Sequence, residues 1–109
     1  MCPNDKLYLV TRADLAPGVQ AVQAAHALQQ FNLEHADTAQ KWCRESNYLA
    51  FLSVPNEASL VRLAEKARKM GLKTSAFMEP DLDDSATAIA IEPGSDSKRL
   101  CRNIPLALS

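Results

Sequence analysis

The sequence lacks paired cysteines, a net basic charge and any long apolar run. Its cysteines, Cys2, Cys43 and Cys101, are widely spaced and include no C-x-x-C pair, which argues against a disulfide framework and against a zinc site. The net charge is −1, so a nucleic-acid partner would have to meet a local basic patch. No apolar run approaches the ~18 residues of a membrane span, and the first residues do not form a signal peptide. We therefore expect a cytosolic protein that does not contact membranes.

The composition is typical of a soluble globular protein. Apolar residues make up 47% of the 109 residues and charged residues 23%. This length suits one domain with a single core, and no repeat, linker or low-complexity segment interrupts it. We expect one domain over residues 1–109.

The order of strand and helix signals predicts an α/β fold. Short apolar runs predict strands at Lys6–Thr11, Tyr48–Val54, Thr74–Met78 and Ala86–Ile91. The first should be central, and the almost continuously apolar second should be buried on both faces. Helical patterns lie within Ala16–Leu33, Asp37–Arg44, Asn56–Met70 and Ser95–Arg102. The connection between the strands Thr74–Met78 and Ala86–Ile91 is too short for a crossover helix, so at least one strand is antiparallel. We predict a three-layer α/β/α domain around a mixed sheet of about four strands.

The helix within Ala16–Leu33 carries the main candidate residue, His26. At 100° per residue, an apolar face forms from Ala21, Ala24, Ala25, Leu28 and Phe31. His26 points away from this face, flanked by Gln23, Gln29 and Gln30. Two interpretations stay open: a solvated surface histidine, or a proton donor and acceptor among amides that hold substrate oxygens.

Other side chains also allow two roles each. Asp14, in the turn before the helix, orients the loop or takes part in chemistry, and Trp42 covers a core edge or stacks on a base. The acidic stretch Glu79–Asp84 is a solvated turn that can lend one carboxylate to a site; without an EF-hand pattern we expect no metal there. Basic residues at helical spacing form a solvated edge or contact phosphates; they are Arg62, Lys66, Lys69 and Lys73.

The last residues of the sequence do not determine the oligomeric state. Leu106 and Leu108 carry apolar side chains that can dock on the same chain or on a second copy, which would make a homodimer.

Two segments together resemble a known family. The first strand ends in L-V-T-R-A-D-L (Leu9–Leu15), and a glycine then opens a helix carrying A-V-Q-A-A-H-A (Ala21–Ala27). This combination resembles the type 2 peptidyl-tRNA hydrolases, and the segments V-P-N-E-A-S-L and A-T-A-I-A-I-E-P-G lie where that family has its third helix and last strand. The resemblance covers roughly Lys6–Gly94. It implies hydrolysis of the ester between a peptide and the 3′ end of tRNA.

The resemblance also implies site residues. Gln23 and His26 occupy family site positions, Asp14 lies in the family's turn, and Asp81 is the counterpart of a family aspartate. Two features depart from the family: the lysine-rich G-K-G-K start of the helix is shortened to Ala16–Gln20 without lysine, and the loop before the last strand is short and acidic. Both changes remove positive charge where a tRNA end would approach.

Two hypotheses of function follow. In the first, His26 assists water attack, Asp81 or Asp14 orients it, and Gln20, Gln23 and Gln30 with helix-start N–H groups hold substrate oxygens, without a metal or cofactor. This hypothesis predicts that His26 and a carboxylate converge within ~3–4 Å, or through one water, in a concave pocket. The alternative is a non-catalytic RNA- or protein-binding module, which instead needs a contiguous basic or apolar surface.

Overall fold

A four-stranded mixed sheet forms the centre of the protein. The computed structural model describes residues 1–109, and the strand order is β2-β1-β4-β3. The strands are β1 (Lys6–Arg12), β2 (Tyr48–Val54), β3 (Thr74–Glu79) and β4 (Ser85–Ile91). β1 pairs in parallel with β2 and antiparallel with β4, which is also antiparallel to β3. The predicted central first strand and the predicted antiparallel strand are both confirmed.

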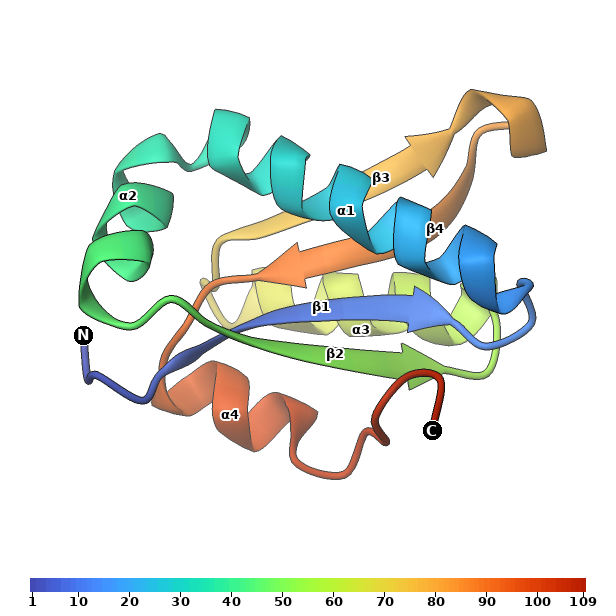
Figure 1. Cartoon of the computed structure of the whole chain (residues 1–109). Helices are drawn as coiled ribbons and strands as arrows, with labels where there is room; N and C mark the ends of the chain where they lie inside the picture. Colours follow the sequence, from blue (N-terminus) through green and yellow to red (C-terminus); the bar gives the residue numbers. More distant parts are fainter.

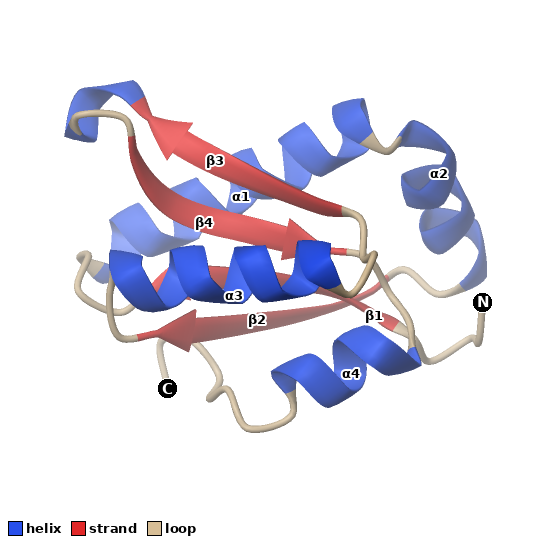
Figure 2. Ribbon diagram, turned by 180° about the vertical axis from the view of Figure 1, so that it is seen from behind, coloured by secondary structure: helices blue, strands red, loops and turns tan.

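Helices cover both faces of this sheet. α1 (Pro17–Glu34) and α2 (Ala36–Glu45) lie on one face, and α3 (Glu57–Lys69) and α4 (Ser95–Cys101) on the other (Figures 1 and 2). Each side has its own core: Phe31 and Trp42 belong to the first, and Leu60 and Cys101 to the second. The α/β class with three layers is confirmed. None of the helices is long and apolar enough to cross a membrane.

α1 buries a different face from the predicted one. Ala24 and Phe31 are buried, as expected, but Ala21 and Ala25 are exposed. The other buried residues of the helix are Gln20, Gln23 and Ala27. The contact face is therefore rotated by roughly 80° about the helix axis, at 100° per residue. The prediction that Gln23 lies on the outer face is wrong, because its side-chain amide forms hydrogen bonds with polar groups inside the fold.

β2 is an edge strand, which corrects the prediction that both its faces are buried. Tyr48 is exposed and only the end of the strand is well covered. The outer edge of β2 pairs with the tail that follows α4: the Ser53 N–H donates to the Pro105 carbonyl (3.0 Å), and the Ala107 N–H donates to the Phe51 carbonyl (2.9 Å). The backbone of the tail thus docks on its own chain, while Leu106 remains 64% exposed.

Helix ends follow local signals on one helix and depart from them on another. Asn56 caps α3 by accepting the Ser59 N–H, and Gly71 follows the helix with φ +80°, as glycine permits. Met70, which follows the last residue of α3, is exposed. The N-cap of α4 is Gly94 with no side-chain cap, although serine and aspartate, the residue types that most often cap helices, follow it directly at Ser95 and Asp96.

Two other predicted segments have defined roles in packing. Trp42 is buried and its indole N–H donates to the Tyr48 carbonyl at 2.8 Å, so it covers the core edge. The acidic stretch contains a single 3-10 turn, η1 (Pro80–Leu82), between β3 and β4. The side chains of the basic series Arg62, Lys66, Lys69 and Lys73 are all exposed.

A candidate active site on the first helix

A chain of hydrogen bonds links α1 to the ends of β4 and β3. Thr87, fully buried in β4, donates its hydroxyl hydrogen to Gln23 Oε1 at 2.6 Å. Gln23 Nε2 in turn donates to Glu79 Oε1 at 2.9 Å. Both ends of the Gln23 amide are therefore satisfied, which explains how a glutamine only 4% exposed fits under the helix. The amide cannot turn without breaking both bonds.

Glu79 stands where this chain of hydrogen bonds reaches the surface. It is half-buried at the end of β3. Its second carboxylate oxygen accepts the Asp81 N–H at 3.5 Å, a long contact. The carboxylate is thus held between α1 and the η1 turn, with Asp81 itself exposed beside it.

His26 lies about one turn after Gln23 on α1. Its side chain is exposed, and its ring stacks on Phe77 of β3, with ring centroids 4.5 Å apart and planes inclined by 10°. The imidazole is therefore held against the sheet edge while it still meets solvent. Neither Asp14 nor Asp81 forms an ion pair with it.

Asp14 has a different partner. Arg12 makes a two-pronged contact with its carboxylate, Nε to Oδ1 at 3.0 Å and Nη2 to Oδ2 at 2.9 Å. This hydrogen bonding holds the pKa of Asp14 below its usual value. Arg12 also donates to the Ala86 carbonyl at 3.2 Å, so the pair ties the turn before α1 to the start of β4.

The remaining predicted residues do not join this cluster. Gln20 is buried near the start of α1, and its Nε2 donates to the Leu15 carbonyl at 2.7 Å. Gln30 lies further along the helix and donates to Glu34 Oε2 at 2.9 Å. The structure therefore brings Gln23 to Glu79 with His26 one turn away, and it leaves Asp14, Gln20 and Gln30 with other partners.

Sequence reasoning missed two members of the cluster, Thr87 and Phe77, which were assigned only to strands. It expected one carboxylate of the acidic stretch Glu79–Asp84 to reach a site, but it did not single out Glu79. A threonine inside the otherwise apolar run A-T-A-I-A-I was the one available signal, because a buried hydroxyl needs a polar partner. No such signal marks which partner it takes.

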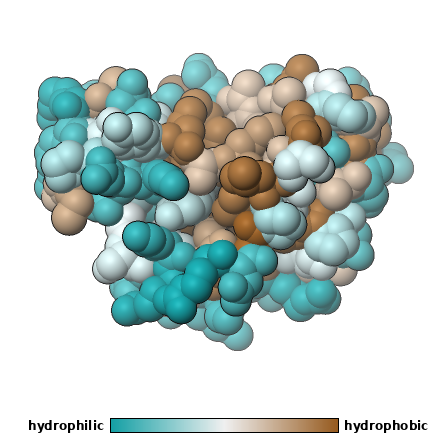
Figure 3. Space-filling view, turned by 60° about the horizontal axis from the view of Figure 1, so that its bottom comes forward, coloured by the Kyte–Doolittle hydropathy of each residue, from teal (hydrophilic) through white to brown (hydrophobic).

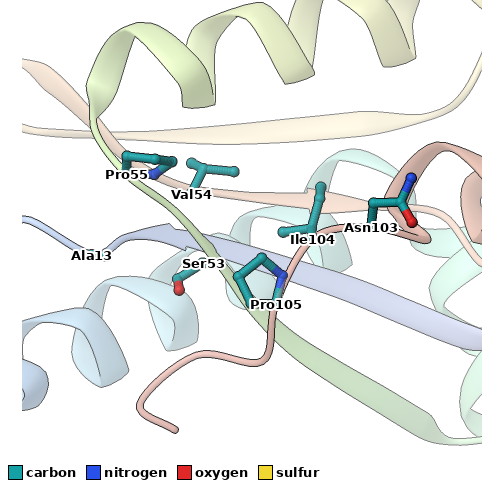
Figure 4. A pocket seen from close by; sticks show the side chains of 7 residues that line it. All are labelled: Ala13, Ser53, Val54, Pro55, Asn103, Ile104 and Pro105. Carbon is teal, nitrogen blue, oxygen red and sulfur yellow. The ribbon is translucent and has the colours of Figure 1, made fainter.

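Two adjoining cavities lie at the same end of the sheet. One, of about 450 Å³, lies between the end of β2 and the tail; Figure 4 shows Val54 and Pro55 on one side of it and Asn103 and Ile104 on the other. The second, of about 490 Å³, lies between the first turn of α1 and the tail. They share Ala13, Ser53 and Pro105. The start of α1 is thus hollowed on the side away from Glu79.

No group of three or more histidine, cysteine, aspartate and glutamate side chains is arranged to hold a metal ion. The cluster instead offers an imidazole, a carboxylate and a fixed amide, which are groups suited to moving protons and orienting a water molecule.

Residues 5–100 match the family model of peptidyl-tRNA hydrolase PTH2. The match covers both strands and helices of the cluster, from β1 through most of α4. It supports a peptidyl-tRNA hydrolase-like function in translation, with peptidyl-tRNA as the family's substrate. The chain belongs to the peptidyl-tRNA hydrolase PTH2 family.

Proposed function

We propose that the chain hydrolyses the ester bond between a peptide, or an N-acyl amino acid, and the 3′ end of tRNA, in the cytoplasm. The observation that carries this proposal is the Gln23 amide, fixed by Thr87 and Glu79 about one turn before the exposed His26. Polar groups that are already oriented before the reaction need little reorganisation in the transition state. Such preorganisation is a main source of the rate enhancement of enzymes. The match to the family supports the same conclusion.

His26 is the proposed general base. Its ring accepts a proton from the attacking water, whose oxygen then bonds to the ester carbonyl carbon. When the tetrahedral intermediate collapses, the bond to the tRNA 3′ oxygen breaks and that oxygen takes the proton back from His26. Glu79 is the carboxylate best placed to orient the water, and Asp81, joined to it through its backbone N–H, is the alternative. The products are a peptide carboxylate and a free 3′ hydroxyl.

The start of α1 is the proposed place for the developing oxyanion. The helix has no side-chain cap and no acidic residue in its first turn, and Pro17 has no N–H to offer. The backbone N–H groups of Gly18 and Val19 therefore lack helical acceptors, and the helix dipole favours negative charge there. These donors replace part of the positive charge that a lysine would bring.

Phosphate contacts are few in this proposal. The basic side chains Arg62, Lys66 and Lys69 lie on α3, across the sheet from α1 (Figures 1 and 2), so they do not extend the site. We expect binding of tRNA to fall only gently with rising salt, because the slope of log K against log salt follows the number of neutralised phosphates.

The test is release of tRNA from a labelled N-acyl-aminoacyl-tRNA. Replacing His26→Ala should lower kcat by about a hundredfold or more, the usual contribution of general base catalysis. His35→Ala is the matched control: this second histidine ends the same helix and packs near Phe31, at 5.0 Å between ring centroids. It should change kcat by no more than about threefold.

Two results would contradict the proposal. Equal turnover by wild type and His26→Ala would remove the histidine from the chemistry. A folded wild type without turnover that still binds peptidyl-tRNA or a protein would favour the alternative, a non-catalytic binding module on the same scaffold.

A further inference from the structure

The cavity between the first turn of α1 and the tail is lined by a residue with an unpaired hydrogen-bond acceptor. Gln20 lines this cavity of about 490 Å³ and is only 5% exposed. Its Oε1 atom is buried and has no hydrogen-bond partner. Its Nε2 donates to the Leu15 carbonyl at 2.7 Å, so turning the amide over would place two oxygens against each other. The acceptor is therefore fixed and unsatisfied.

Buried acceptors without partners are unfavourable and rare in folded proteins, so one in a cavity wall points to a donor supplied by a ligand. The other such atom, Ser97 Oγ, lies in α4 on the opposite face of the sheet. Only Gln20 thus combines an unpaired buried atom with the cavity at the start of α1.

The rest of the cavity wall is mostly apolar and has no acidic or basic side chain, and Ser53 and Ser109 are its other polar residues. Pro17 lies on the helix side, and Pro105, Leu106 and Leu108 lie on the tail side. The two leucines are 64% and 52% exposed. Figure 3 views the molecule with the side of α4 and the tail turned forward and shows apolar residues gathered on this face, bordered by hydrophilic ones. The volume lies in the range of small-molecule sites. The fitting ligand has an apolar body and one N–H or O–H donor.

We propose that this cavity binds the acyl portion of the substrate, with the apolar side chain of the esterified residue against the tail and its amide N–H donating to Gln20 Oε1. This inference rests on the proposed function. Gln20 follows Gly18 by two residues, which is about 3 Å along the helix axis. An acylated amino acid whose amide N–H donates to Gln20 therefore has its ester carbonyl near the start of α1, where we propose that Gly18 and Val19 hold the oxyanion.

The test uses two stable probes that differ in one donor. N-acetyl-L-leucine dimethylamide has one N–H, and its N-methyl analogue has none. In NMR titrations of the whole chain, wild type should bind the first about tenfold more tightly, because a lost hydrogen bond to a buried acceptor has about this effect. In Gln20→Met the ratio should fall to about one. Gln29→Met, an exposed glutamine on the same helix, is the matched control and should keep the tenfold ratio.

A second variant guards against a folding defect in Gln20→Met. Leu108→Glu changes an exposed residue of the tail and places a charge beside the apolar probe, so both probes should lose about tenfold in affinity without loss of structure. An unchanged ratio in Gln20→Met, or unchanged affinities in Leu108→Glu, would overturn the inference.

Different experimental results would contradict the acyl site and the proposed hydrolase function. Turnover of N-acyl-aminoacyl-tRNA without probe binding at this cavity would leave the hydrolase and remove the acyl site. Probe binding with the expected ratio, but no turnover, would support the cavity as an acyl-amino-acid site and remove the hydrolase.

Discussion

Thr87 and Gln23 form a buried hydrogen bond of 2.6 Å although 64 residues separate them in sequence. The bond fastens α1 to β4 and selects which atom of the amide faces Glu79. Because Thr87 supplies the donor, Gln23 Oε1 is occupied and Nε2 is left for the carboxylate. One hydroxyl therefore sets the orientation of the whole cluster.

Replacing Thr87→Val should destabilise the fold by about 1–3 kcal/mol, because valine keeps the volume but leaves Gln23 Oε1 buried without a donor. Thr87→Ser keeps the hydroxyl and should cost only about 1 kcal/mol for the lost methyl group. Urea unfolding followed by the fluorescence of the single tryptophan, Trp42, measures both. Equal losses in the two variants would show that packing, and not the hydrogen bond, sets the stability here.

The stack of His26 on Phe77 predicts a spectroscopic and a kinetic change. Phe77→Leu removes the ring and should return the His26 proton resonances toward their values in a free peptide, with a loss of about 1 kcal/mol from the aromatic contact. Under the proposed function, kcat should fall about threefold to tenfold while KM is retained. Phe77→Tyr keeps the ring and serves as the control. Unshifted His26 resonances in Phe77→Leu would show that the ring does not stay on the stack in solution.

The fold was largely predictable because its signals are local. Asn56 marks the start of α3 through its own side chain, and Gly71 marks the end through its backbone. The buried face of α1 was not predictable in this way. Alanines occur on more than one side of the helix, so periodicity leaves its rotation open, and the deciding partners of Gln23 are 56 and 64 residues away.

The residues of the candidate site differ in the same way: some could be identified from the local sequence, and others depend on contacts that are distant in sequence. His26 and Gln23 were identified by their helix and by the family resemblance, whereas Glu79 and Thr87 enter only when β3 and β4 are brought beneath α1. For Asp14, the nearest partner is Arg12, two residues away. A local ion pair of this kind competes with any role in chemistry, and the sequence alone does not say which prevails.

Stability at acid pH should report on Glu34. The hydroxyl of Ser75 donates to Glu34 Oε1 at 2.6 Å and holds the pKa of this carboxyl below its usual 4.5. A lowered folded-state pKa adds stability that is present above the unfolded value and is lost as the pH falls through the folded value. Ser75→Ala should therefore cost less than about 1 kcal/mol at pH 7, since Glu34 is exposed to solvent.

The difference between wild type and Ser75→Ala should shrink as the pH falls below 4.5 and both proteins come to protonate this carboxyl. Urea unfolding at a series of pH values measures it. Gln30→Ala removes the second hydrogen bond to Glu34 and should act in the same direction. A difference in unfolding free energy that stays constant with pH would show that the loss of stability comes from the small void left when the serine hydroxyl is removed.

Hydrogen exchange should show that the tail protects β2. Ala107→Pro removes the N–H that donates to the Phe51 carbonyl, and so loosens the neighbouring bond from Ser53 to Pro105. The amide of Ser53 should then exchange about tenfold faster, for the loss of about 1.4 kcal/mol of local stability. Ala107→Gly keeps the N–H and should stay within about threefold of wild type. Unchanged protection in Ala107→Pro would mean that the side-chain packing of the tail suffices.

The cysteines should differ sharply in reactivity. Cys2 and Cys43 are exposed, whereas Cys101 is buried in α4, and burial raises the pKa of its thiol from 9.0 to about 11. Only the thiolate is nucleophilic, so at pH 8 about a thousandth of Cys101 is reactive even where a reagent can reach it. Iodoacetamide should modify Cys2 and Cys43 within minutes, and Cys101 only after urea is added, as mass spectrometry would show.

The same shift has a consequence for stability. A raised folded-state pKa contributes stability that is fully present below the unfolded value of 9.0 and is lost as the pH rises through about 11. Unfolding free energies measured between these two pH values should therefore decline in wild type and decline less in Cys101→Ala, whereas Cys43→Ala should follow wild type. Equal slopes of unfolding free energy against pH in the three proteins would mean that ionisation of the Cys101 thiol does not contribute to the decline. The decline would then come from other groups, such as Tyr8, whose pKa is also raised by burial.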